Sequence, residues 1–276
     1  MAFPVRMTGL TALVLVAALA SGPVAAQTEV EVDLELILAV DVSRSMDEDE
    51  QILQRKGYAD ALRDEQVLTA ISGGLHGRIA LTYVEWAGPD SRRQLIPWAV
   101  IGSAAEAEGF AQALEAAPLE AWRGTSISSG LLFAAELFDA SGYKGLRRVI
   151  DISGDGPNNM GPPVDQTRDM LVQAGIVING LPLNLKMPGG MFNIERLDIY
   201  YEDCVIGGPG AFLITVEDPA RLKDAIRRKM VLEISGLVPA KPDRPGGLAG
   251  IIPAQYSPPR IDCMIGERLR QRMWDY

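Results

Sequence analysis

The sequence predicts an α/β fold: a doubly wound, mostly parallel sheet with helices on both faces and one antiparallel edge strand. Short, nearly continuous apolar runs alternate along the chain with segments of helical spacing. Such alternation is typical of parallel strands joined by crossover helices that cover both sides of the sheet. Residues 78–86 and 94–101 instead flank the turn Gly88-Pro89-Asp90, and this hairpin spacing predicts the antiparallel edge.

Apolar runs, capping residues, glycines and prolines define each element in turn. For example, Gly73-Gly74 ends the first helix, and Ser103 with Glu106 three residues later is a capping box that begins the second. The expected elements are a strand at Leu34–Val40, a helix at Glu48–Ser72, strands at Arg78–Trp86 and Gln94–Ile101, helices at Ser103–Ala116 and Ser126–Phe138, a strand at Leu146–Ile152, a helix at Pro162–Ala174, strands at Ile176–Leu181 and Phe212–Val216, and a helix at Pro219–Ile234.

The N-terminus has the pattern of a secretory signal peptide over residues 1–26. Arg6 supplies the positive charge, Leu10–Ala20 is a short apolar run, and Val24-Ala25-Ala26 offers small residues for cleavage. The run is too short to span a bilayer comfortably, and no later stretch is apolar enough for a membrane helix. We therefore expect an exported protein, periplasmic or extracellular, with no transmembrane segment after signal cleavage.

The chain has two cysteines, Cys204 and Cys263. In an oxidising compartment such a pair favours one disulfide, which would tie the C-terminal tail to the body of the protein. The alternative is two separate buried thiols.

Composition excludes several function classes. Lys and Arg total 26 against 36 Asp and Glu, a net charge of −10, which argues against nucleic acid as a partner. The single histidine, His76, excludes a zinc site built from several imidazoles, and its Gly-rich turn offers no nucleophile motif for a Ser-His-Asp triad.

Three loops carry clusters of hard oxygen donors. Asp41, Ser43 and Ser45 follow the first strand, Thr125 precedes a helix, and Asp155 follows the strand at 146–152. In an open α/β sheet the carboxyl ends of the strands face one edge, where ligands bind. Carboxylate and hydroxyl oxygens suit Mg²⁺ or Mn²⁺ rather than zinc. Each residue has an alternative role, since Asp41, Ser43 and Thr125 could simply cap the helices that follow them.

These motifs resemble the von Willebrand factor type A (vWA) domain and its metal-ion-dependent adhesion site (MIDAS). The Asp-x-Ser-x-Ser motif of that family corresponds to Asp41, Ser43 and Ser45, its loop threonine to Thr125, and its aspartate to Asp155. The chain also resembles a bacterial family of secreted proteins that contain this domain and whose function is not established.

The resemblance covers residues 33–236 and implies a bound Mg²⁺ with one open position for the Asp or Glu carboxylate of a protein partner. The chain departs from the family at Gly154, where Thr or Ser is more usual. It also carries an insertion at 184–210 and a Pro- and Gly-rich extension at 237–276, which are absent from a minimal vWA domain.

The expected function is metal-dependent protein binding rather than catalysis. The alternative is a Mg²⁺-dependent phosphohydrolase of haloacid dehalogenase type, with Asp41 as nucleophile and Asp155 in the acidic metal motif. That chemistry needs a second carboxylate where Ser43 stands and a well-placed lysine, for which Lys144 is a poor candidate. Tyr200 and Tyr201 on the insertion are candidates for a binding surface.

Overall fold

The computed structural model of the chain describes residues 29–185, 194–237 and 261–273. The expected signal peptide at 1–26 lies outside the described residues. In the order of the sheet, the five central strands are β4 (Arg92–Ile101), β3 (Ile79–Trp86), β2 (Glu35–Asp41), β6 (Arg148–Gly154) and β7 (Ile176–Pro182). All neighbours are parallel except β3 and β4, which confirms the expected mostly parallel sheet with one antiparallel edge.

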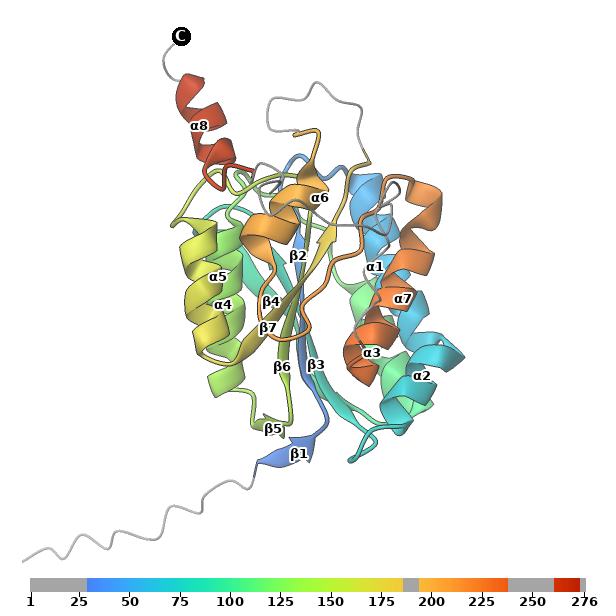
Figure 1. Ribbon diagram of the computed structural model, residues 1–276. Helices are drawn as coiled ribbons and strands as arrows, with labels where there is room; N and C mark the ends of the chain where they lie inside the picture. The colour runs from blue at the N-terminus through green and yellow to red at the C-terminus, as the bar shows by residue number, and fades with distance from the viewer. Residues whose placement is uncertain (1–28, 186–193, 238–260, 274–276) are drawn as a thin grey trace, which may run out of the picture.

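Helices cover both faces of this sheet (Figure 1). The helices are α1 (Glu48–Arg63), α2 (Glu65–Ser72), α3 (Ala104–Ala116), α4 (Ile127–Asp139), α5 (Val164–Gln173), α6 (Leu197–Tyr200) continued by a π-helical turn (Tyr201–Val205), α7 (Leu222–Ser235) preceded by a 3₁₀ turn (Pro219–Arg221), and α8 (Ile265–Arg272). A separate two-stranded parallel sheet, β1 (Val30–Val32) with β5 (Tyr143–Gly145), lies at the opposite end of the molecule from α8.

Alternation along β2 explains the two layers of core. Leu36, Leu38 and Val40 belong to the hydrophobic cluster beneath α1, α3 and α7, whereas Ile37 and Ala39 belong to the cluster beneath α4 and α5. Successive side chains of a strand point to opposite faces, so an entirely apolar strand needs cover on both. The apolar run in the sequence therefore fixes β2 at the centre of the sheet.

Most expected strands and helices are present with bounds shifted by a few residues, and two expected elements differ more deeply. The helix expected at Glu48–Ser72 divides at Asp64, whose extended backbone ends α1 and whose side chain accepts a hydrogen bond from Gln66 N as the N-cap of α2. The strand expected at Phe212–Val216 forms only isolated bridges to Gly180 and Leu183 beside β7. Between these bridges lies Pro182, which has no amide hydrogen to continue a ladder.

Candidate metal centre

Asp41 is the last residue of β2 and is fully buried. Its Oδ1 accepts a hydrogen bond from Ser43 N at 2.7 Å, which turns the chain sharply out of the sheet. The N-cap of α1 is Asp47, whose Oδ1 accepts from Glu50 N at 2.9 Å. Asp41 and Ser43 therefore do not cap the following helix. They form hydrogen bonds within the loop after β2 instead.

The β2 and β6 loops meet because these strands are parallel neighbours, with Val40 opposite Ser153. Ser43 Oγ and Ser45 Oγ share a hydrogen bond of 2.8 Å, and Ser45 Oγ donates to Asp155 Oδ1 at 2.7 Å. A chain of hydrogen bonds thus joins four of the five expected oxygen donors, Asp41, Ser43, Ser45 and Asp155, although Asp155 is far from the others in the sequence.

The fifth expected donor, Thr125, lies in the loop before α4. The N-cap of α4 is Ser126 rather than Thr125. Thr125 N donates to Asn159 Oδ1 at 3.2 Å, and Asn159 N donates to Thr125 O at 2.9 Å, so the main chain of this loop is fixed to the loop after β6. Thr125 lines a cavity of about 380 Å³ together with Ser43 and Ser45, which brings it to the edge of the same group.

This donor set fits a hard divalent cation. Among the described residues, no three or more His, Cys, Asp or Glu side chains are grouped so that they could hold a metal ion, so a cation here would depend on two carboxylates and several hydroxyls. Adjacent ligands in octahedral Mg²⁺ sites lie about 3 Å apart, since each Mg–O distance is about 2.1 Å. The 2.7 and 2.8 Å contacts of Ser45 with Asp155 and Ser43 are close to this spacing.

Tyr201 fills the space left by Gly154, a role that the sequence analysis did not recognise. A Cβ atom at position 154 would lie 2.9 Å from Tyr201 Oη and 3.1 Å from Asp41 Oδ2, which accounts for glycine where the vWA motif usually has Thr or Ser. Tyr201 and Tyr200 are both fully buried, so their expected place on a binding surface is wrong. The unusual glycine was the available signal that another group occupies this space.

The Tyr201 hydroxyl has no hydrogen-bond partner among the described residues. Burial, and then the negative charges of Asp41 and Asp155, raise the pKa of Tyr201 well above its usual value. The hydroxyl therefore keeps its proton and lies beside the Asp41 carboxylate as a neutral dipole.

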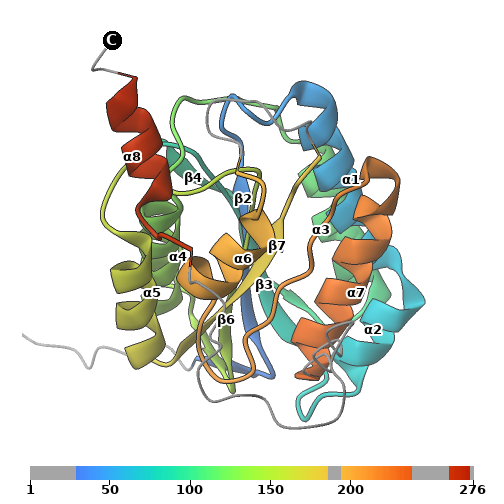
Figure 2. The ribbon, with the colours of Figure 1, turned by 45° about the horizontal axis from the view of Figure 1, so that its top comes forward.

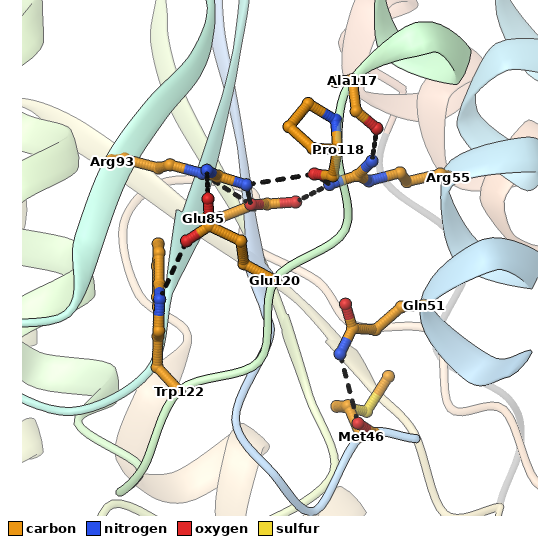
Figure 3. A network of polar contacts seen from close by, with 9 residues as sticks. All are labelled: Met46, Gln51, Arg55, Glu85, Arg93, Ala117, Pro118, Glu120 and Trp122. Atoms are coloured by element: carbon orange, nitrogen blue, oxygen red, sulfur yellow. Dashed lines mark hydrogen bonds and ion pairs between the residues drawn. The ribbon is translucent and has the colours of Figure 1, made fainter. Parts of the chain in front are cut away.

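A buried ion-pair network supports the loop that leads to Thr125 (Figure 3). Glu85 on β3 is fully buried and accepts from Arg55 Nη2 on α1 at 2.5 Å and from Arg93 Nη2 on β4 at 2.7 Å. The same Arg55 donates to the carbonyl oxygens of Ala117 and Pro118 at 2.5 and 2.9 Å. A helix, two strands and the loop are thus connected through one carboxylate.

The same loop also contacts the Asp-x-Ser-x-Ser segment through its main chain. Arg44 N donates to Trp122 O at 2.8 Å, and Trp122 N donates to Val42 O at 3.0 Å. The loop is therefore fixed to the β2 loop at 122 and, through Thr125, to the loop after β6.

The C-terminal segment is joined to this end of the molecule by a disulfide between Cys204 and Cys263. Tyr200 Oη also donates to Cys263 O at 3.3 Å. The bond that the sequence analysis expected is thus present, and it links the segment before α8 to the π-helical turn that carries Tyr201.

The phosphohydrolase alternative receives no support. Ser43 occupies the place of the second carboxylate and is hydrogen-bonded to Ser45. Lys144 lies in β5, at the opposite end of the molecule from the carboxyl ends of β2 and β6 (Figure 1).

Across the described ranges, none of the helices has both the length and the apolar character needed to cross a bilayer.

The chain belongs to a family described as a protein of unknown function (DUF1194), whose profile matches residues 31–238. A search of curated proteins finds no match.

Among solved structures, the chain is similar to proximal thread matrix protein 1 from the mussel byssus (16% identity, TM-score 0.55, 75% of this chain and 49% of that one). It is similar to the pilus adhesin SpaC from Lactobacillus rhamnosus GG (12%, TM-score 0.54, 74% and 30%) and to a von Willebrand factor type A protein from Catenulispora acidiphila (15%, TM-score 0.51, 74% and 43%). The mussel protein is also known with a zinc-occupied MIDAS motif.

This chain spans half or less of the length of these proteins. At these identities the likeness shows the fold, which is that of vWA-type domains.

Proposed function

We propose that this chain is an exported, metal-dependent protein-binding domain and not an enzyme. Asp41, Ser43, Ser45, Thr125 and Asp155 would hold Mg²⁺ or Mn²⁺, and a partner protein would supply an Asp or Glu carboxylate to the open position. The observation that carries the proposal is the convergence of oxygen donors from loops after β2 and β6, with Ser45 bonded to both Ser43 and Asp155.

The chemistry of the donors explains why such a site would take a carboxylate. Two carboxylates balance the charge of a divalent cation, and the remaining ligands are neutral hydroxyls, which leave the cation a strong acceptor for one more anionic oxygen. Because Asp41 is buried and fixed by Ser43 N, its contribution to the site is preorganised.

Two further observations support this class of function. The fold neighbours include a pilus adhesin and a thread matrix protein of the mussel byssus that is known with zinc in its MIDAS motif. A disulfide is typical of proteins that fold in an oxidising compartment, in agreement with a signal peptide at 1–26 and placement in the periplasm or outside the cell.

Titration calorimetry with Mg²⁺ tests the proposal. We expect a binding heat for the wild type that is lost in Asp41→Ala. Asp49→Ala is the matched control, since Asp49 is an exposed carboxylate in the first turn of α1 and should leave the heat unchanged. Equal heats for the wild type and Asp41→Ala would refute the metal site.

A further inference from the structure

A cavity beside the candidate metal centre is lined by three arginines from three different segments. Arg44 comes from the loop after β2, Arg123 from the loop before α4, and Arg270 from α8. The remaining lining residues are Ser43, Ser45, Gly124, Thr125, Asn159, Met160 and Met273. The cavity therefore combines proposed cation ligands with fixed positive charge.

These arginines differ from most others in the chain, because none of the three has an ion-pair partner among the described residues. Arg55, Arg63 and Arg93, in contrast, each pair with two or more glutamates or carbonyls. A concentration of unpaired positive charge is notable on a chain whose net charge is −10. With a divalent cation balanced by Asp41 and Asp155, the guanidinium groups would leave the cavity strongly positive.

The position of α8, and with it that of Arg270, is fixed by contacts with the body of the protein. A Cβ atom at Gly266 would lie 2.0 Å from Asn158 O, so α8 approaches the loop after β6 as closely as only glycine permits. Asn158 Nδ2 donates to Glu267 Oε1 at 2.7 Å, and the disulfide holds the segment just before the helix. Arg270 is one helical turn beyond Glu267, and α8 stands at the site edge of the molecule (Figure 2).

We propose that this arginine-lined cavity binds a second carboxylate of the same partner, so that the recognised segment carries two nearby acidic side chains. One would complete the cation's coordination, and the other would pair with Arg270, assisted by Arg44 and Arg123. Guanidinium groups bind carboxylates through two parallel hydrogen bonds, which strengthens binding and fixes the orientation of the bound carboxylate. This inference rests on the proposed function and specifies the partner as an acidic protein segment.

Synthetic peptides test this inference. The probes are capped glycine–serine hexapeptides that carry one Asp, or two Asp separated by one, two or three residues, titrated in saturating Mg²⁺. For the wild type we expect at least one two-Asp peptide to bind about tenfold more tightly than the one-Asp peptide, the effect of one charge-assisted pair.

Arg270→Gln should abolish that advantage, so that the two-Asp and one-Asp peptides bind this variant with equal affinity. Arg272→Gln, on the same helix but outside the cavity lining, removes the same charge and should preserve the advantage. Equal affinity of all peptides for the wild type, or an equal loss for both variants, would overturn the arginine site.

Failure of the proposed function would appear differently. If no peptide binds and Mg²⁺ gives no heat, both proposals are wrong. If the two-Asp advantage persists in chelator and depends on Arg270, the arginine site stands and the metal-dependent function is refuted. If the one-Asp peptide binds in Mg²⁺ and a second Asp adds nothing, only this inference is overturned.

Discussion

Glu85 is the buried carboxylate that holds the loop leading to Thr125, and Glu85→Gln tests its role. The substitution keeps the size of the side chain and removes its charge. Arg55 and Arg93 then lose their common partner, although Arg55 keeps the carbonyl oxygens of Ala117 and Pro118 (Figure 3).

The expected magnitude follows from burial. The side chains of Glu85 and Arg55 are 0% and 7% exposed, so the variant leaves a guanidinium without its counter-charge in the interior. Breaking a buried pair by removing one partner costs about 3–5 kcal/mol. The matched control is Glu120→Gln, because Glu120 also pairs with Arg93 but is 42% exposed, where a pair is worth about 1 kcal/mol or less.

Thermal unfolding followed by circular dichroism gives the comparison. For a chain of this size about 2–4 °C corresponds to 1 kcal/mol, so we expect Tm to fall by roughly 6–20 °C in Glu85→Gln and by at most about 4 °C in Glu120→Gln. Glu85→Gln should also weaken Mg²⁺ binding, since the Thr125 loop loses its support. Equal Tm shifts in the two variants would refute the assignment of Glu85 as the organising charge.

Two further predictions concern other buried groups. Burial, and then the charge of Asp151, raise the pKa of Glu233 to about 7. A carboxyl whose pKa is raised in the folded state contributes stability that is lost as pH rises from its unfolded pKa near 4.5 through about 7. The free energy of unfolding of Glu233→Gln should therefore rise by roughly 2–3 kcal/mol relative to that of the wild type between pH 5 and 8, measured by urea unfolding. A difference that does not change with pH would contradict this. Gly154→Ala should weaken Mg²⁺ binding in calorimetry because its Cβ would crowd Tyr201 Oη, and Tyr201→Phe in the same chain should restore part of the affinity. If the second substitution has no effect, Tyr201 does not set the space at this loop.

Much of the sheet could be predicted because β2 and β6 are short, mostly apolar runs, although β6 ends at Gly154, two residues beyond the expected end at Ile152. The polar residues that directly follow a central strand must emerge at the carboxyl edge, so Asp41 and Asp155 could be expected at the same edge of the sheet. Their closeness depends on the pairing of β2 with β6, which chain order does not fix. The division of the first helix could not be predicted as securely. Asp64 is an ordinary residue on a helical surface until its side chain caps the next helix.

The rest depends on contacts between segments that are distant in the sequence. Nothing local indicates that Tyr201 is buried against Gly154, because an aromatic residue on an insertion is equally compatible with a surface. Similarly, Gly266 indicates a close approach only once Asn158 is known to lie opposite. The contribution of Arg270 to the cavity therefore required the three-dimensional structure, whereas the oxygen donors did not.

The metal site itself is tested by a crystal structure grown with Mn²⁺, with anomalous differences measured at the manganese absorption edge. We expect one strong peak among the oxygen atoms of the five proposed ligands, Asp41, Ser43, Ser45, Thr125 and Asp155. A well-ordered loop region without a peak, or manganese bound only elsewhere on the chain, would rule out this metal site.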